Sequence, residues 1–181
     1  MDLTNKRFVI FGLQGSGKSV LAKAILRANP DHLVYDAMNE YKGYTRWRPE
    51  HPNSLLELER VITDIVIPKR VPLFIVDEAN RYVPARKSLP LAVSELNDKS
   101  RHWGISWGMI ARRISQFNSD ITQLAHYLFI FRLPGRLDRR ILNDQIEGLG
   151  DTVATLPPHH FAVVENGQGY FVHGPVKEGW M

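Results

Sequence analysis

Residues 12–19 read Gly12-Leu13-Gln14-Gly15-Ser16-Gly17-Lys18-Ser19, the pattern of a phosphate-binding loop, or P-loop. An apolar run over 7–11 precedes it, and a helical pattern over 18–28 follows. Glycines let the backbone wrap around an anion and aim N–H groups at phosphate oxygens. We expect Lys18 to reach the β- and γ-phosphates of ATP and the Ser19 hydroxyl to help hold Mg²⁺. The predicted nucleotide-binding residues are 12–19 together with Val20.

A second motif, Phe74-Ile75-Val76-Asp77-Glu78, ends a predicted strand with two carboxylates. Asp77 at the strand end can hold Mg²⁺ through its water shell. Glu78 then stands beside the γ-phosphate and can activate a water as a general base. In the simpler alternative, Glu78 is a surface carboxylate after a strand. The order of P-loop, helix, strand, helix and then this motif favours the catalytic interpretation.

The remaining chain alternates apolar runs with helical patterns. Strands are predicted over 33–36, 73–76, 105–110 and 127–131, helices over 54–66, 91–101, 119–125 and 136–147, and a loop over 38–52. Asn166-Gly167, between apolar runs at 161–164 and 170–172, indicates a hairpin. Together these elements predict one α/β domain over 1–181. Its sheet is mainly parallel and covered by helices on both faces, with an antiparallel hairpin at one edge.

Composition narrows the class of protein. Hydrophobic residues make up 44% and charged residues 23%, as in soluble globular proteins, and no apolar run approaches the roughly 18 residues of a membrane span. The absence of cysteine excludes disulfides and Cys-ligated metals. With no signal peptide at the polar N-terminus, we expect a cytosolic protein. The net charge of +4 permits nucleic-acid binding but equally suits a nucleotide polyphosphate.

Two groups of cations suggest partners. Arg101 and Arg132 are candidates for an arginine that acts on a neighbouring subunit's γ-phosphate. In the alternatives, Arg101 caps its helix electrostatically and Arg132 is a surface residue. The stretch from Tyr41 to Arg48 interleaves cations with aromatics, as a DNA-facing loop does, although such a loop can also fold onto the domain and bury Trp47. The candidate DNA contacts are Lys42, Arg46, Arg48, Arg86 and Lys87.

In these motifs the chain resembles the FtsK–HerA superfamily of DNA-pumping ATPases. Within it, the chain is similar to the small genome-packaging ATPases of tailless, membrane-containing double-stranded DNA viruses. The resemblance runs from the P-loop to the helix after the fifth strand. It rests on Val76-Asp77-Glu78-Ala79-Asn80-Arg81-Tyr82-Val83-Pro84, on Ser100-Arg101-His102-Trp103-Gly104-Ile105, on Leu128-Phe129-Ile130-Phe131-Arg132-Leu133 and on Asp138-Arg139-Arg140.

The resemblance implies a RecA-like core of the ASCE class, assembly into a ring, and DNA threaded through its pore. Carried over by position, Lys18 and Ser19 bind phosphate and Mg²⁺, Asp77 supports Mg²⁺, Glu78 is the base and Arg101 is the trans-acting finger. The chain departs from the family at Asn80, where His is common. It departs again at Ala111-Arg112-Arg113, where the family has Thr-Gln and the Gln senses the γ-phosphate. Arg113 would occupy the sensor's place, or Gln116 would reach in from the next turn.

We therefore expect an ATP-driven translocase that packages a viral double-stranded DNA genome, independently of its sequence, as a pentameric or hexameric ring. Its partners would be capsid or membrane vertex proteins, and it would act in the host cytoplasm at the virion or procapsid vertex. The alternatives are another HerA-like or phage-assembly ATPase, a small-molecule kinase, and a nucleotide-dependent module without turnover. A kinase would need an arginine-bearing lid, and Asp77-Glu78 suits water attack better than transfer to a substrate.

Overall fold

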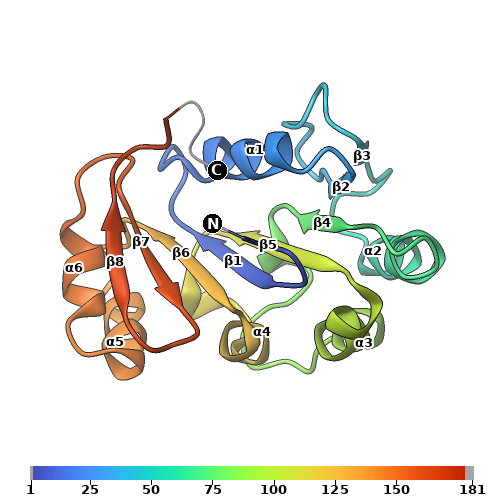
Figure 1. The fold of residues 1–181 in the computed structure, drawn as a ribbon. Coiled ribbons are helices and arrows are strands. Elements are labelled where there is room, and N and C mark those ends of the chain that lie inside the picture. Colours follow the sequence, from blue (N-terminus) through green and yellow to red (C-terminus); the bar gives the residue numbers. More distant parts are fainter. Residues whose placement is uncertain (1, 178–181) are drawn as a thin grey trace.

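The computed structural model describes residues 2–177, and in that part of the chain the centre of the molecule is an eight-stranded sheet in the order β3-β2-β4-β5-β1-β6-β7-β8 (Figure 1). The strands are β1 Arg7–Phe11, β2 His32–Tyr35, β3 Arg46–Trp47, β4 Leu73–Val76, β5 Ser106–Ala111, β6 Tyr127–Phe131, β7 Phe161–Glu165 and β8 Tyr170–His173. β1 to β6 pair in parallel, and β7 and β8 add an antiparallel hairpin at one edge. The predicted fold class is thus confirmed. Met1 and residues 178–181 of the expected 1–181 domain lie outside the described residues.

Helices cover both faces of this sheet. They are α1 Lys18–Ala28, α2 Leu55–Val61, α3 Leu91–Lys99, α4 Ser119–Leu124, α5 Arg136–Gln145 and α6 Leu149–Thr155. Figure 1 shows α1 on one side and α3, α4 and α5 on the other. The buried residues form two clusters accordingly, one beneath α1 and one that packs the sheet against α2 to α6. No helix among the described residues is long and apolar enough to cross a membrane.

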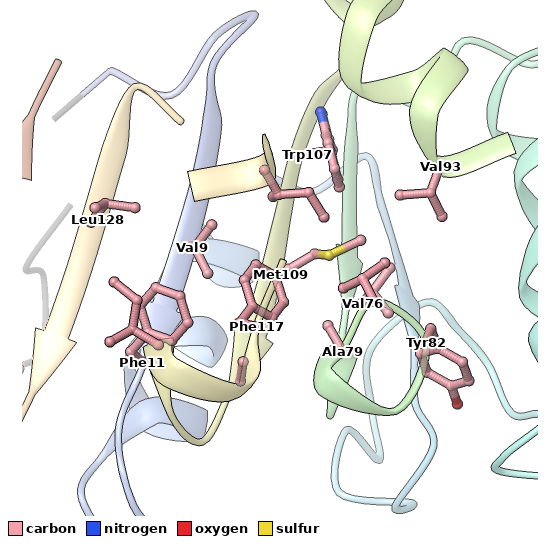
Figure 2. Packing of buried hydrophobic residues seen from close by; sticks show 14 of the residues in the cluster. Val9, Phe11, Val76, Ala79, Tyr82, Val93, Trp107, Met109, Phe117 and Leu128 are labelled. Carbon is pink, nitrogen blue, oxygen red and sulfur yellow. The ribbon is translucent and has the colours of Figure 1, made fainter. Parts of the chain in front are cut away.

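β1 illustrates why these strands read as continuous apolar runs. Val9 and Phe11 belong to the cluster beneath α2 to α6, whereas Phe8 and Ile10 belong to the cluster beneath α1. Figure 2 shows Val9 and Phe11 beside Met109 and Phe117. The rings of Phe11 and Phe117 meet edge to face at 5.3 Å. Each large apolar side chain buried here contributes roughly 1.5–3 kcal/mol, so both faces of the strand must be apolar.

Several elements differ from the sequence predictions. The expected loop over 38–52 contains β3, a two-residue strand that pairs with β2 and is too short to show an apolar alternation. Helix α6 was not predicted, because it follows Gly148 directly and has no side-chain cap. The predicted helix over 54–66 is α2 followed by a π-helical turn over Ile62–Val66. The helix over 91–101 ends at Lys99 and continues as a 3₁₀ turn over Ser100–Trp103.

Candidate active site

The P-loop joins β1 to α1 and has the backbone that its glycines predict. Gly15 and Gly17 adopt positive φ angles of 74° and 111°, which other residues rarely adopt. A Cβ on Gly12 would lie 2.4 Å from Ser16 Oγ and 2.7 Å from Phe131 Cβ, so the loop closes tightly only with glycine there. Helix α1 begins at Lys18, which aims the unpaired N–H groups of its first turn at the space inside the loop.

The charged groups of the loop are in place for an anion. The Lys18 ammonium donates to the carbonyl of Leu13 at 2.9 Å, so it lies inside the loop. Burial lowers the pKa of Lys18, while the nearby charges of Glu78 and Asp77 raise it. Ser16 Oγ is buried without a hydrogen-bond partner among the described residues. A phosphate would supply an acceptor for both groups.

Asp77 follows β4 at the same edge of the sheet, with one strand, β5, between it and the P-loop strand. It is only 5% exposed. Its Oδ1 accepts a hydrogen bond from the Glu78 N–H at 2.9 Å. The pKa of Asp77 is raised to about 7, mainly by burial and in smaller part by the charges of Glu78 and Glu40, against the lowering effect of that hydrogen bond. A cation beside Asp77 would relieve this cost.

Glu40 is a carboxylate of this site that the sequence analysis missed. The Ser19 hydroxyl donates to Glu40 Oε2 at 2.9 Å. Asp36, which is fully buried, fixes the turn by accepting hydrogen bonds from the backbone N–H groups of Glu40 and Tyr41 at 2.9 and 3.0 Å. An Asp at the end of a predicted strand, followed four residues later by Glu, was the available signal.

These residues fit a Mg²⁺ ion that arrives with a nucleotide. Asp77 takes part in none of the ion pairs found among the described residues, and the raised pKa of its buried carboxyl marks a site short of positive charge. No group of three or more His, Asp or Glu side chains in residues 2–177 forms a complete metal site. Ser19 and Asp77 would therefore contribute ligands or hold water ligands, and the phosphates would supply the rest.

Glu78 has an unusual backbone and a cationic partner. Its φ and ψ angles of 50° and 38° are left-handed, which costs about 1 kcal/mol or more for a residue other than glycine. The Arg112 guanidinium binds the Glu78 carboxylate, with Nε 3.1 Å from Oε2 and Nη2 3.1 Å from Oε1. Sequence reasoning did not single out Arg112. The side chain of Glu78 is 15% exposed, so a water molecule can reach it.

The two predicted sensor residues lie elsewhere. Arg113 points toward α5, where its Nε lies 3.8 Å from Oδ2 of the buried Asp138. Gln116 lies in a 3₁₀ turn over Ile114–Gln116 and is exposed. Asp138 also accepts a hydrogen bond from the Ser115 N–H at 3.0 Å, so it anchors the chain after β5 to α5. Of the two adjacent arginines, Arg112 and not Arg113 contacts the residues of the site.

Arg101 and Arg132 lie at opposite ends of the parallel strands. Arg101 is exposed in the 3₁₀ turn before β5, at the amino ends of the strands. β5 has six residues and, at about 3.3 Å per residue, separates Arg101 from its own P-loop by roughly 20 Å. Arg132 follows β6 at the P-loop edge, is exposed, and donates from Nε to the carbonyl of Ala154 at 3.3 Å. Arg101 therefore lies too far from the P-loop of its own chain to reach a γ-phosphate bound there.

The candidate DNA contacts divide into two kinds. Lys42, Arg48, Arg86 and Lys87 are exposed. Arg46 instead pairs with buried Asp36 at 2.5 Å and so helps to fix the turn that carries Glu40. Trp47 is 37% exposed, and its indole N–H donates to Glu57 Oε1 at 3.0 Å, so this loop folds onto α2.

A small apolar pocket adjoins the P-loop. It has a volume of about 240 Å³ and is lined by Gly17, Val20, Phe131, His159, Pro175 and Val176. Val20, in the first turn of α1, is 53% exposed. The pocket is large enough for a nucleobase beside phosphates held by the loop.

The comparison of the sequence with protein-family profiles found no match, and neither did the comparison with curated proteins. Solved structures do match. The DNA-packaging ATPase B204 from Sulfolobus turreted icosahedral virus is 19% identical, with a TM-score of 0.84 over 97% of this chain and 100% of that chain. The genome packaging NTPase B204 of Sulfolobus turreted icosahedral virus 2, in complex with ATP-gammaS, gives 19% identity and a TM-score of 0.82 over 98% and 100%.

More distant structures share the same core. The N-terminal domain of zonular occludens toxin from Neisseria meningitidis is 15% identical, with a TM-score of 0.64 over 96% of this chain and 95% of that chain. VirB4 of Thermoanaerobacter pseudethanolicus is 12% identical, with a TM-score of 0.64 over 96% and 90%. At these identities the likeness concerns the fold. The protein has the fold of P-loop ATPases and viral packaging NTPases, as the sequence resemblance implied.

Proposed function

We propose that this protein is an ATP-hydrolysing DNA translocase that packages a viral double-stranded DNA genome into a preformed capsid. The observation that carries the proposal is the meeting of Lys18, Ser19, Asp77 and Glu78 at one edge of a sheet that has the fold of viral packaging NTPases. A bare nucleotide-binding module would have no use for a carboxylate like Glu78 next to Asp77. Residues 1–181 act in this proposal as a single ATPase domain.

In the hydrolytic step, Glu78 takes a proton from a water molecule as the water oxygen attacks the γ-phosphorus of ATP. The bond between the γ-phosphorus and the bridging oxygen breaks, and ADP and phosphate leave. Lys18 and the N–H groups of the P-loop stabilise the negative charge of the phosphates. Mg²⁺, when bound near Ser19 and Asp77, neutralises further phosphate charge. The nucleobase occupies the apolar pocket beside Gly17 and Val20.

As a motor, the protein would work as a homo-oligomeric ring, pentameric or hexameric, around double-stranded DNA. Arg101 supports this assembly, because it lies at the edge of the sheet away from its own P-loop and would complete the site of a neighbour. Exposed Lys42, Arg48, Arg86 and Lys87 would contact DNA phosphates without reading the sequence. The ring would dock on capsid or membrane vertex proteins in the host cytoplasm.

The ATPase rate with and without double-stranded DNA tests this function. We expect ATP hydrolysis that DNA of any sequence stimulates, with stimulation that weakens steeply between low and high salt because the contacts are to phosphates. Glu78→Gln is the control for contaminating ATPases. Hydrolysis unaffected by DNA would indicate another P-loop ATPase, and transfer of phosphate to a small molecule would indicate a kinase.

A further inference from the structure

Arg112 contacts Glu78 and has no part in the proposed hydrolytic step. It is the first residue after β5, and β5 lies between the P-loop strand and the Asp77 strand. Ala111 pairs with Phe11 at the end of β1, and its carbonyl accepts a hydrogen bond from the Gly12 N–H at 3.2 Å. Arg112 is therefore level with the first residue of the P-loop.

The guanidinium of Arg112 spans the distance from this strand end to Glu78. Nε lies 3.2 Å from Oε1 and 3.1 Å from Oε2 of Glu78, and Nη2 lies 3.1 Å from Oε1. Arg112 also acts on Lys18, because its charge lowers the pKa of that ammonium, although burial lowers it more. Arg112 thus contacts the proposed general base directly, and its charge also acts on the ammonium that would hold the β- and γ-phosphates.

The ion pair between Arg112 and Glu78 is weak enough for Arg112 to exchange the carboxylate for a phosphate. The side chain of Arg112 is 46% exposed and that of Glu78 is 15% exposed, so water screens the pair and holds it only weakly. A planar guanidinium binds a carboxylate or a phosphate through the same two parallel N–H groups. A γ-phosphate carries more negative charge than one carboxylate, and it would arrive beside Lys18, within the reach of Arg112.

We propose that Arg112 senses the γ-phosphate: it holds Glu78 until ATP binds, then transfers to the γ-phosphate and frees the carboxylate to accept a proton from water. This inference rests on the proposed ATP hydrolysis. It assigns to Arg112 the place for which Arg113 and Gln116 were the sequence candidates. Arg113 remains a structural link between the strand end and Asp138 of α5.

The test compares the binding of ATPγS and ADP, which differ by the γ-thiophosphate alone. We expect Arg112→Ala to weaken ATPγS binding about tenfold and to leave ADP binding within about twofold, since only the first ligand reaches the guanidinium. Arg112→Lys keeps the positive charge but loses the two parallel N–H donors of the guanidinium, so it should retain part of the preference for ATPγS over ADP. Arg60→Ala, which removes an exposed arginine from α2, is the matched control and should change neither affinity.

Steady-state hydrolysis provides the second measurement. Loss of a preorganised donor to the transferring group should lower kcat by about 10²-fold in Arg112→Ala, with a smaller change in the KM for ATP. If Arg112→Ala had a higher kcat than the wild type, with both proteins assayed without DNA, Arg112 would only restrain Glu78. That result would overturn the proposal. An unchanged ratio of ATPγS to ADP affinity would overturn it as well.

Two further outcomes separate the inference from its premise. If the wild-type protein neither bound ATPγS nor hydrolysed ATP, the proposed function itself would be wrong. If the wild type were active and Arg112→Ala matched it, only the role of Arg112 would be lost. The melting temperature of each variant checks folding, and Arg112→Lys decides the question should the alanine variant unfold.

Discussion

The carboxyl ends and the amino ends of the parallel strands form two opposite edges of the central sheet, and these two edges hold different parts of the proposed ATPase site. The edge at the carboxyl ends of the strands carries the P-loop, Asp77 and Glu78, which together can bind ATP and activate water. The edge at the amino ends carries Arg101 beside Arg7 and His126, whose pKa values the Arg101 charge lowers, although burial lowers both more. In the proposed ring, one subunit would hold a nucleotide site and, at the opposite ends of its strands, a cation that could serve only the site of a neighbour.

Removing the cation at the amino edge should have the largest effect. Arg101→Ala should lower the rate of ATP hydrolysis by about 10³-fold or more, because an arginine delivered to a γ-phosphate is worth that much. The binding of ATPγS to an isolated subunit should stay unchanged. Rates measured across protein concentrations check the mechanism, and full activity in a strictly monomeric preparation would rule out a role in trans.

Changing the carboxyl edge should give a loss of rate of similar or smaller size. Glu78→Gln keeps the shape of the side chain but cannot accept a proton, so hydrolysis should fall by about 10²–10⁴-fold while ATP still binds. Single-turnover hydrolysis together with fluorescent-nucleotide binding measures the two properties separately. Turnover near the wild-type rate would show that another group activates the water.

A smaller effect concerns stability at the carboxyl edge. The pKa of Asp77 is raised by burial from its usual 3.8 to about 7, so the folded protein keeps a proton that the unfolded chain loses as pH rises above about 4. Folding should therefore lose stability between about pH 4 and pH 7, and Asp77→Asn should remove that loss. At about 1.4 kcal/mol per pKa unit, the variant should gain on the order of 4 kcal/mol above pH 7 without nucleotide or Mg²⁺.

Melting temperatures of both proteins from pH 5 to pH 8 check the sign. The difference between the variant and the wild type should grow as pH rises and then level off. Saturating Mg²⁺ and ATPγS should reverse the order, because the cation stabilises the ionised carboxylate of the wild type alone. A constant difference over the whole range would contradict the raised pKa.

The sequence predicted the regular parts of the fold closely and the irregular parts poorly. The strands over 7–11, 73–76 and 127–131 and the helix over 18–28 have the predicted bounds, because buried strands and a P-loop helix have strong local patterns. Glu40 was missed because it lies in a turn fixed by the buried Asp36, and no periodicity reveals such a contact. The residues of the P-loop and the carboxylates at 77 and 78 meet at one edge, as parallel strands require, while their roles remain proposals.

The sensor position shows that a family motif need not locate a role when its residues differ. The sequence analysis placed Arg113 at this position because the resemblance puts the family's Gln there. Successive side chains of an extended chain point in opposite directions, so only one of two adjacent arginines can face the site. Arg112 contacts Glu78, and Arg113 turns to Asp138. Tertiary packing decides which of the two arginines faces the site, so the sequence alone left the sensor unresolved.

Mixing two inactive variants tests most directly whether the two edges form one site between subunits. Arg101→Ala spoils the amino edge and Glu78→Gln the carboxyl edge, so a mixed ring contains some interfaces with both residues intact. We expect mixtures of the two proteins to regain ATPase activity that neither shows alone, with a maximum near equal proportions. Mass spectrometry of the assemblies would establish that mixed rings form. Mixed rings without any recovered activity would contradict a site shared between the two edges.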